Sequence, residues 1–532
     1  MPESVSRTER SKPLLERIAA AISAAMAWIA LHPRRIRGRG LAFKVALIVA
    51  LAIIVVAGVA RGEPIDITTD PVIAPAEPDV ELPAIPEAPP ARDYTAAEVS
   101  HAQAPGAESG RIDDESGDSW LRVAGRTGLF VPKLAVVVAL SPVRGLVWVN
   151  DRYQLEQLYF RVFFNADRTI GLYPTATYES GFGASAGARF VDRDVFGQLE
   201  HFAIAATTGA VTGEPYREEF LASFNTGHRL GRHLVLGIEA NFNRRPSDPF
   251  YGIGNGDLVS QPSRVIDPVM DPTAFETYLR YQEERVAMSS DVRVFDHVHV
   301  LASGALTELA FSRSASGVPI DMVYDSAGLV GFTTGVRHLY GELELRWDTR
   351  RRVSQFEPKG VHSSGSLVAA FAGRVDQLDG GADFWRYGCE LQHFFRIAKG
   401  PRALVLRFHG EGVTGSLDQV PFVELPELGG GAFLRGYPFE RFRDRVAAFG
   451  SVQYEWDVSH LADAYIFADA GRVFRSLDNV GFSDMRLGFG IGAEVHSDVG
   501  FLFEATIASS IDGGVFLSAS FNPVLDARAR WR

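Results

Sequence analysis

Apolar and polar residues alternate along most of this sequence, and that alternation constrains the fold more than any other feature. In 339–348, leucine, glycine and tryptophan fill one set of alternate positions, while tyrosine, glutamate, arginine and aspartate fill the other. The same pattern recurs in 234–243, 452–458 and 487–496. Side chains of an extended strand point alternately to its two faces, so a period of two predicts strands. The region from Thr169 to Phe521 is therefore predicted to be all-β.

The composition of the two faces favours a transmembrane antiparallel β-barrel over a soluble sandwich. One face is apolar and almost free of charge, and the other carries charge and glycine. This is the pattern of a wall with lipid outside and a polar lumen inside, and closure leaves no unpaired strand edge in the lipid. We expect about sixteen strands, because bacterial barrels of this kind have an even number. Aromatic residues recur near the predicted strand ends, as in a membrane-interface girdle: Tyr173, Phe190, Phe220, Phe224, Phe408, Phe501 and Phe521.

The charges divide the chain before the barrel into two regions. Residues 1–62 hold ten Lys/Arg and three Asp/Glu, and the basic cluster at 34–44 is followed by an apolar run at 45–59 and then by small residues. These are the parts of a secretory signal peptide with a long basic n-region. A retained membrane anchor is the alternative, because 41–60 is just long enough to span a bilayer as a helix. We favour the cleaved signal.

A second region is predicted to be a linker. Residues 63–118 hold fourteen Asp/Glu against two Arg, with nine prolines between Pro64 and Pro105. Such a composition cannot bury enough apolar surface to offset its ordering entropy, so we expect disorder. Apolar residues at roughly helical spacing predict a partly helical pre-barrel segment at 119–166. The barrel is then expected at 167–522, with a basic tail at 523–532.

Two motifs in the predicted barrel resemble a known family. Leu434-Arg435-Gly436-Tyr437 follows a run of three glycines in a predicted loop, and Phe467-Ala468-Asp469-Ala470-Gly471 lies on a strand further along the chain. In this order they resemble the bacterial surface antigen family, which includes the BamA- and TamA-type outer-membrane insertases and two-partner-secretion transporters. The resemblance covers roughly 169–521. The proline-rich stretch before Trp120 is too short for the family's polypeptide-transport-associated (POTRA) domains, so we expect a barrel-only member.

The alternation places the second motif in the lumen. Ile466 and its alternate neighbours face lipid, so Phe467, Asp469 and Gly471 face inward. A carboxylate there favours a cation, and arginine offers a planar fork that binds carboxylate at two points. A loop folding inward would bring Arg435 to Asp469. The resemblance implies that this contact holds the loop in the barrel and is needed for full activity; the alternative is that Asp469 is only solvated.

Two further residues are candidates for the same site. Gln453 and Glu455 face the lumen on a neighbouring strand. The family often has an acidic residue followed two positions later by a basic one there, and this chain has Gln and then Glu. The sequence therefore leaves open which residue is the second partner of Arg435.

Other functional classes find little support. A net charge of −12 argues against nucleic-acid binding. One cysteine, Cys389, and scattered histidines give no metal site, and no cofactor is expected. The stretch 183–187 fits G-x-S-x-G, but it lies inside a predicted strand rather than a strand–turn–helix. We therefore expect no enzyme.

Three functions are carried forward. The first is assembly or translocation of outer-membrane proteins or lipids, with a seam between the first and last strands weakened by glycines at 181, 183, 187, 513 and 514. The second is a passive or ligand-selective pore, and the third a tether between the two membranes. We expect an integral protein of the bacterial outer membrane, exported through the inner membrane. The expected partners are outer-membrane lipid, substrate outer-membrane or surface proteins, and the barrel-assembly machinery that inserts it.

Overall fold

The computed structural model describes one body that begins just before the predicted barrel. The described residues are 145, 148, 152–180, 183–209, 217–262, 265–268, 273–350, 364–397, 402–459, 462–497 and 500–520. The predicted signal or anchor, the linker and the basic tail lie outside them, as does most of the pre-barrel segment. Within these residues, no helix has the length and apolar character needed to cross a membrane.

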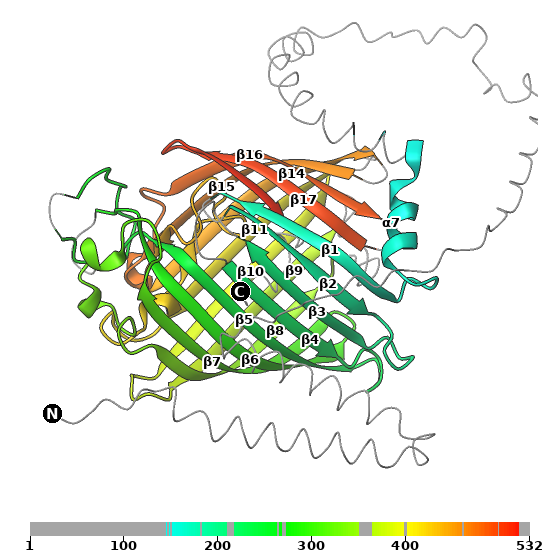
Figure 1. Ribbon diagram of the computed structural model, residues 1–532, viewed down its shortest axis with the longest axis horizontal. Coiled ribbons are helices and arrows are strands. Elements are labelled where there is room, and N and C mark those ends of the chain that lie inside the picture. The colour runs from blue at the N-terminus through cyan, green and yellow to red at the C-terminus, as the bar shows by residue number, and fades with distance from the viewer. Residues whose placement is uncertain are drawn as a thin grey trace, which may run out of the picture. The chain divides into compact units, whose positions relative to one another are not determined.

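Sixteen antiparallel strands of the described chain close into a barrel (Figure 1). Their bounds are β1 Ile170–Glu179, β2 Gly183–Asp192, β3 His201–Gly209, β4 Arg217–Asn225, β5 Leu234–Phe250, β6 Thr277–Phe295, β7 Val298–Arg313, β8 Val336–Asp348, β9 Gly365–Gln377, β10 Phe384–Arg396, β11 Arg402–Val413, β14 Val446–Ser459, β15 Ala462–Phe474, β16 Arg486–Ser497, β17 Gly500–Ser510 and β18 Val515–Ser520. Each strand pairs with the next along the barrel, and β1 pairs with β18. The predicted sixteen-stranded antiparallel barrel is confirmed.

The alternation of the sequence becomes an inside and an outside of the wall. Along β8, Leu343 and Leu345 are 63% and 58% exposed, whereas Glu344 and Arg346 between them are 2% and 3% exposed. The inward pair is joined by an ion pair of 2.7 Å between Arg346 Nε and Glu344 Oε1. Large apolar side chains thus cover the outer face, as contact with lipid requires, and charged groups are buried in the lumen.

Long connections pack together at one end of the barrel. They lie at 251–276 between β5 and β6, at 314–335 between β7 and β8, and at 414–445 between β11 and β14, which includes a short two-stranded sheet of β12 (Glu427–Leu428) and β13 (Phe442–Arg443). Their shared apolar core contains Phe250, Ile266, Leu279, Ile320, Val323, Tyr324, Leu329 and Phe422. The core fixes the start of the third connection, which continues toward the lumen.

The seam between the first and last strands is short. β1 pairs with β2 along ten residues, but with β18 only through Tyr178↔Ala519 and Glu179↔Ser518. Ser180 extends the contact by donating its backbone N–H to the Leu517 carbonyl at 2.9 Å. The rest of β1, Ile170–Thr177, has no strand partner on this side among the described residues, and it contains Pro174. Proline within sheets is confined to edge strands, to strand ends and to bulges, so this stretch has the character of an edge.

A short helix packs against the inner face of β1. Helix α7 spans Leu155–Phe163, within the segment where the sequence predicts a helix. Tyr159 on this helix and Phe164 just after it contact Tyr173 of β1, with ring centroids 6.1 Å and 5.6 Å apart. Gly171 makes room for Phe164, because a Cβ there would lie 2.4 Å from the ring.

The core of the long connections gives a first prediction. Phe422 is 2% exposed and its ring contacts Phe250, Phe311 and Phe332. We expect Phe422→Ala to cost about 3–5 kcal/mol locally and to speed proteolysis within these connections in the folded barrel. Phe482→Ala is the control, since that ring is 97% exposed in the loop between β15 and β16. Equal cleavage rates for the wild type and both variants would contradict the packing described.

Candidate functional site

The segment 429–437, here called the lumen loop, lies directly against the inner wall of the barrel. Four of its residues have positive φ: Gly429 at 126°, Gly430 at 83°, Leu434 at 60° and Gly436 at 96°. A Cβ on Gly436 would lie 2.2 Å from the Ser509 carbonyl oxygen on β17. A Cβ on Gly488 of β16 would lie 1.8 Å from the Arg435 carbonyl oxygen. Glycine is therefore needed on both sides of this contact, because any side chain would push the loop off the wall.

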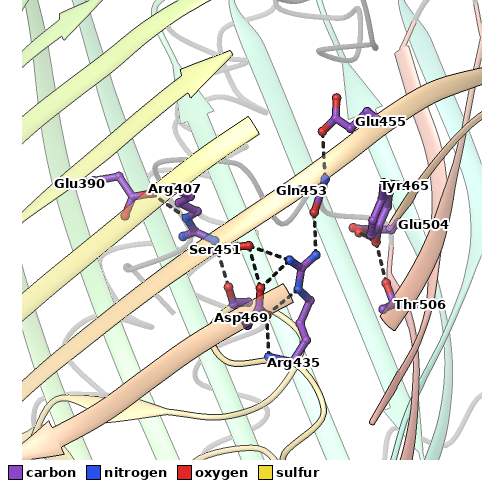
Figure 2. Close-up of polar contacts among 11 residues, drawn as sticks. Glu390, Arg407, Arg435, Ser451, Gln453, Glu455, Tyr465, Asp469, Glu504 and Thr506 are labelled. Atoms are coloured by element: carbon purple, nitrogen blue, oxygen red, sulfur yellow. Dashed lines mark hydrogen bonds and ion pairs between the residues drawn. The ribbon is translucent and has the colours of Figure 1, made fainter. Parts of the chain in front are cut away.

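Every side-chain nitrogen of Arg435 is hydrogen-bonded to the wall (Figure 2). Its Nε and Nη2 donate to the two carboxylate oxygens of Asp469, each at 2.9 Å. Its Nη1 donates to Gln453 Oε1 at 2.8 Å and its Nη2 also donates to Ser451 Oγ at 3.1 Å. The backbone N–H of Arg435 adds a bond of 3.0 Å to Asp469 Oδ2. The predicted contact between Arg435 and Asp469 thus exists as a two-point ion pair supported by neutral partners.

The ion pair is buried, so its contribution to folding stability depends on its hydrogen-bond geometry. Arg435 is 3% exposed and Asp469 is 1% exposed. Burial alone would lower the pKa of Arg435, but the Asp469 carboxylate more than offsets it and raises that pKa. A buried pair of this kind adds little net stability, but removing one partner leaves an uncompensated buried charge, which costs several kcal/mol.

The guanidinium of Arg435 also packs against an aromatic ring of the wall. The Arg435 Cζ atom lies 3.5 Å from the ring centroid of Phe467 on β15. The rings of Phe467 and Tyr465 extend over Gly490 and Gly492 of β16, where added Cβ atoms would lie 2.7 Å and 2.1 Å from them. The absence of side chains at Gly490 and Gly492 therefore lets the aromatic rings lie along the wall.

The other predicted residues take unequal parts in the site. Gln453 contacts Arg435 directly, and its amide donates to Glu455 Oε1 at 2.9 Å, so Glu455 supports Gln453 rather than the arginine. Leu434 is fully buried, and a Cβ on Gly471 would lie 3.4 Å from its Cδ1. The Tyr437 hydroxyl donates to the Leu487 carbonyl at a long 3.4 Å.

Sequence reasoning missed Ser451 and the glycine face of β16. Ser451 Oγ donates to Asp469 Oδ1 at 2.7 Å while accepting from Arg435. The alternation places Ser451 on the lumen face two residues before Gln453, so the signal was present. The inward glycines of β16 were visible in the same way, but their role depends on which loop passes over them.

A second contact holds the lumen loop against strand β11, next to β14, and sequence reasoning also missed it. Arg407 on β11 donates from Nη1 to the Ala432 carbonyl at 2.9 Å and from Nε to Glu390 Oε1 at 2.7 Å. The Phe433 ring lies 4.7 Å from the Arg407 Cζ and 4.5 Å from the His409 ring. The loop therefore contacts β11, which Arg407 links to β10, as well as β14–β17, along one continuous stretch of wall in which β11 pairs with β14. No local sequence pattern predicts this contact, because it depends on the path of a loop.

Carboxylates crowd the wall next to Arg435. The register places Asp463 opposite Glu494, and Glu494 opposite Glu504, on three successive strands. Like charges directly opposite one another repel. The Tyr465 hydroxyl donates to Glu504, and Glu504 is among the charges that act on Arg435. Arg435 therefore faces more negative charge than its ion-pair partner alone.

Comparisons with known proteins find likenesses only among solved structures. No family model and no curated protein sequence matches this chain. Among solved structures, BamA from Haemophilus ducreyi lacking POTRA domains 1–3 has a TM-score of 0.46 at 12% identity, covering 66% of this chain and 70% of that one. CdiB from Acinetobacter baumannii has 0.42 at 8% identity, covering 66% and 59%. CdiB from Escherichia coli has 0.43 at 9% identity, covering 65% and 62%, so this chain spans about six tenths of the two CdiB chains. At TM-scores below 0.5 these likenesses do not assign the chain to a family.

The buried ion pair gives a second prediction. Arg435→Ala leaves Asp469 as an unpaired buried charge, so we expect the free energy of unfolding to fall by about 3–5 kcal/mol. Adding Asp469→Asn removes that charge and should restore part of the loss. Urea unfolding of the folded protein in detergent, followed by tryptophan fluorescence, measures both. Arg472→Ala is the control, because its ion pair with the largely exposed Asp484 should contribute about 0–1 kcal/mol.

The glycine contact gives a third prediction. Gly488→Ala should displace the Arg435 carbonyl and release the lumen loop, because the strand backbone cannot yield by the distance required. We expect faster proteolysis at the lumen loop and a loss of stability comparable with Arg435→Ala. Gly341→Ala on β8 serves as control, since a Cβ there meets nothing within 4 Å. An unchanged Gly488→Ala protein would refute the close approach.

Proposed function

We propose that this chain is an outer-membrane barrel that inserts or translocates other proteins, or lipids, through its β1–β18 seam. The observation that carries the proposal is a seam of two residue pairs within the described chain, in a barrel whose wall is braced from inside by the lumen loop. The resemblance of both loop and strand motifs to the surface antigen family supports the same function.

The seam has the physical properties that such a function needs. Each backbone hydrogen bond contributes only about 0.5–1.5 kcal/mol net, so two residue pairs can be separated at low energy. Separation would extend the edge of β1, and an exposed strand edge pairs readily with a strand from another chain. Most of β1 already lacks a described partner on that side.

The lumen loop would keep the rest of the barrel in place while the seam opens. Arg435 attaches it to β14 and β15, and Arg407 attaches it to β11. The outer apolar face would contact outer-membrane lipid, and assembly machinery would insert the chain after export through the inner membrane. A passive pore is less well supported, because the lumen loop lies within the lumen that a pore would need.

A reversible lock on the seam tests the proposal. Tyr178 and Ala519 are opposite one another, so Tyr178→Cys with Ala519→Cys in a Cys389→Ser background allows a disulfide across the seam. We expect cells depleted of the wild-type chain to lose several unrelated outer-membrane proteins. The oxidised double variant should fail to restore them, and reductant should recover the function.

A matched disulfide between β1 and β2 controls for cross-linking itself. Ala176 and Ala186 are opposite one another away from the seam, and their double cysteine variant should support function whether oxidised or reduced. Full rescue by the oxidised seam variant would show that seam opening is not the working step. An unchanged outer-membrane proteome on depletion would exclude general protein insertion.

A further inference from the structure

The open edge of β1 is only a few residues long, and its backbone groups can be assigned one by one. Ser180 donates its N–H to the Leu517 carbonyl across the seam, and successive residues of a strand turn their backbone groups to opposite sides. Even-numbered residues of β1 therefore present their N–H and C=O groups to the seam. At the far end, the Ile170 carbonyl accepts from the Asn165 N–H at 2.9 Å, and the Ile170 N–H donates to Asn165 Oδ1 at 3.0 Å. Between this end and the two pairs with β18, the groups without a described partner belong to Leu172, Pro174 and Ala176.

One buried side chain on the same stretch also lacks a partner. Thr175 is on the lumen side of β1, and its Oγ1 is buried with no hydrogen-bond partner among the described residues. A buried hydroxyl in this condition costs free energy that a partner would recover. Leu172 and Tyr178, on the alternate positions, are exposed on the outer face. The edge therefore needs a partner strand with a polar side chain on its inner face and apolar side chains on its outer face.

The register of the seam fixes which residues of the chain would lie opposite this edge. Tyr178 is opposite Ala519, and residue numbers rise along one antiparallel strand as they fall along the other. A continuation of β18 would therefore place Phe521 opposite Ala176, Asn522 opposite Thr175, Pro523 opposite Pro174 and Leu525 opposite Leu172.

The sequence that follows β18 has the residue types that these positions need. Val515 and Leu517 lie on the outer face of β18 and are exposed. The same alternate positions continue with apolar residues, namely Ala519, Phe521, Pro523 and Leu525. The position opposite Thr175 is Asn522, whose amide can both donate to and accept from a hydroxyl. The pattern thus matches the edge of β1 on both faces.

We propose that residues 521–525 extend β18 and pair with the remaining edge of β1, so that a segment of this chain occupies its own seam. Five residues are sufficient, because Asn165 already occupies the backbone groups of Ile170. Pro174 and Pro523 have no N–H groups, so their pair exchanges no hydrogen bonds and separates two pairs that do. The added pairing is therefore easier to separate than a continuous ladder. The inference does not rest on the function proposed above, although under that function an incoming strand would first have to displace this segment.

Disulfide cross-linking of the purified full chain tests both the pairing and its register. Thr175 and Asn522 would form a non-hydrogen-bonded pair, in which Cα atoms lie about 4.5 Å apart, within the range that a disulfide spans. We expect Thr175→Cys with Asn522→Cys, in a Cys389→Ser background, to cross-link almost completely under mild oxidation. Mass spectrometry of unreduced peptides measures the yield. The matched control is Thr175→Cys with Asp526→Cys, which moves the second thiol about 13 Å along the strand and should cross-link at least tenfold less.

Equal yields from the two variants, or no cross-link in either, would overturn the proposal. Heat-modifiable electrophoretic mobility confirms that each variant is folded. If Thr175→Cys prevents folding, Ala176→Cys with Phe521→Cys tests the same register, and Ala176→Cys with Leu525→Cys is then the displaced control. The yield is measured without any substrate protein, so a failure of this pairing is distinguishable from a failure of the proposed function.

Discussion

A chain inside a bilayer has to satisfy its backbone N–H and C=O groups internally, and the rest of this structure depends on that constraint. Closure into a barrel meets it for most strands, and it forces every strand to divide its side chains between lipid and lumen. Once the apolar half is outside, charged residues such as Glu344 and Arg346 have to find partners inside. The lumen is therefore a crowded polar interior, in which a loop can be bound as firmly as a core helix in a soluble protein.

Among the described residues, the same constraint is least satisfied where β1 meets β18, and the chain places unusual chemistry on one flank of that seam. Asp463, Glu494 and Glu504 stand opposite one another on adjacent strands. Like charges placed in this way are costly for folding alone. Their position beside the weakest part of the wall is consistent with a surface that meets other molecules.

Much of the fold could be predicted from the sequence because period two is a local property. The inward position of Asp469 followed from the alternation, and its pairing with Arg435 followed from the chemistry of carboxylate and guanidinium together with the motif resemblance. The contacts of Phe433 and Arg407 could not be predicted, because they depend on the path of the long loop that connects β11 and β14. The length of the seam was equally hidden, since glycine content does not reveal how many residue pairs two strands form. The regions before residue 145 and after Ser520 lie outside the described structure, so the sequence-based interpretation of them stays a prediction.

The glycines on the inner face of β16 have a consequence for the register of the lumen loop. Alternate residues on a strand are spaced by about 6.6–6.8 Å, so Gly488, Gly490 and Gly492 form three equivalent steps along one track. Phe467 and Tyr465 cover the second and third steps, and only Gly488 is left open to the Arg435 carbonyl. The lumen loop can therefore pack against β16 at only one of these three glycines. Shifting the loop from Gly488 to Gly490 would require the Phe467 ring to move first. The loop is therefore either in this position or released from the wall, with no intermediate positions along β16.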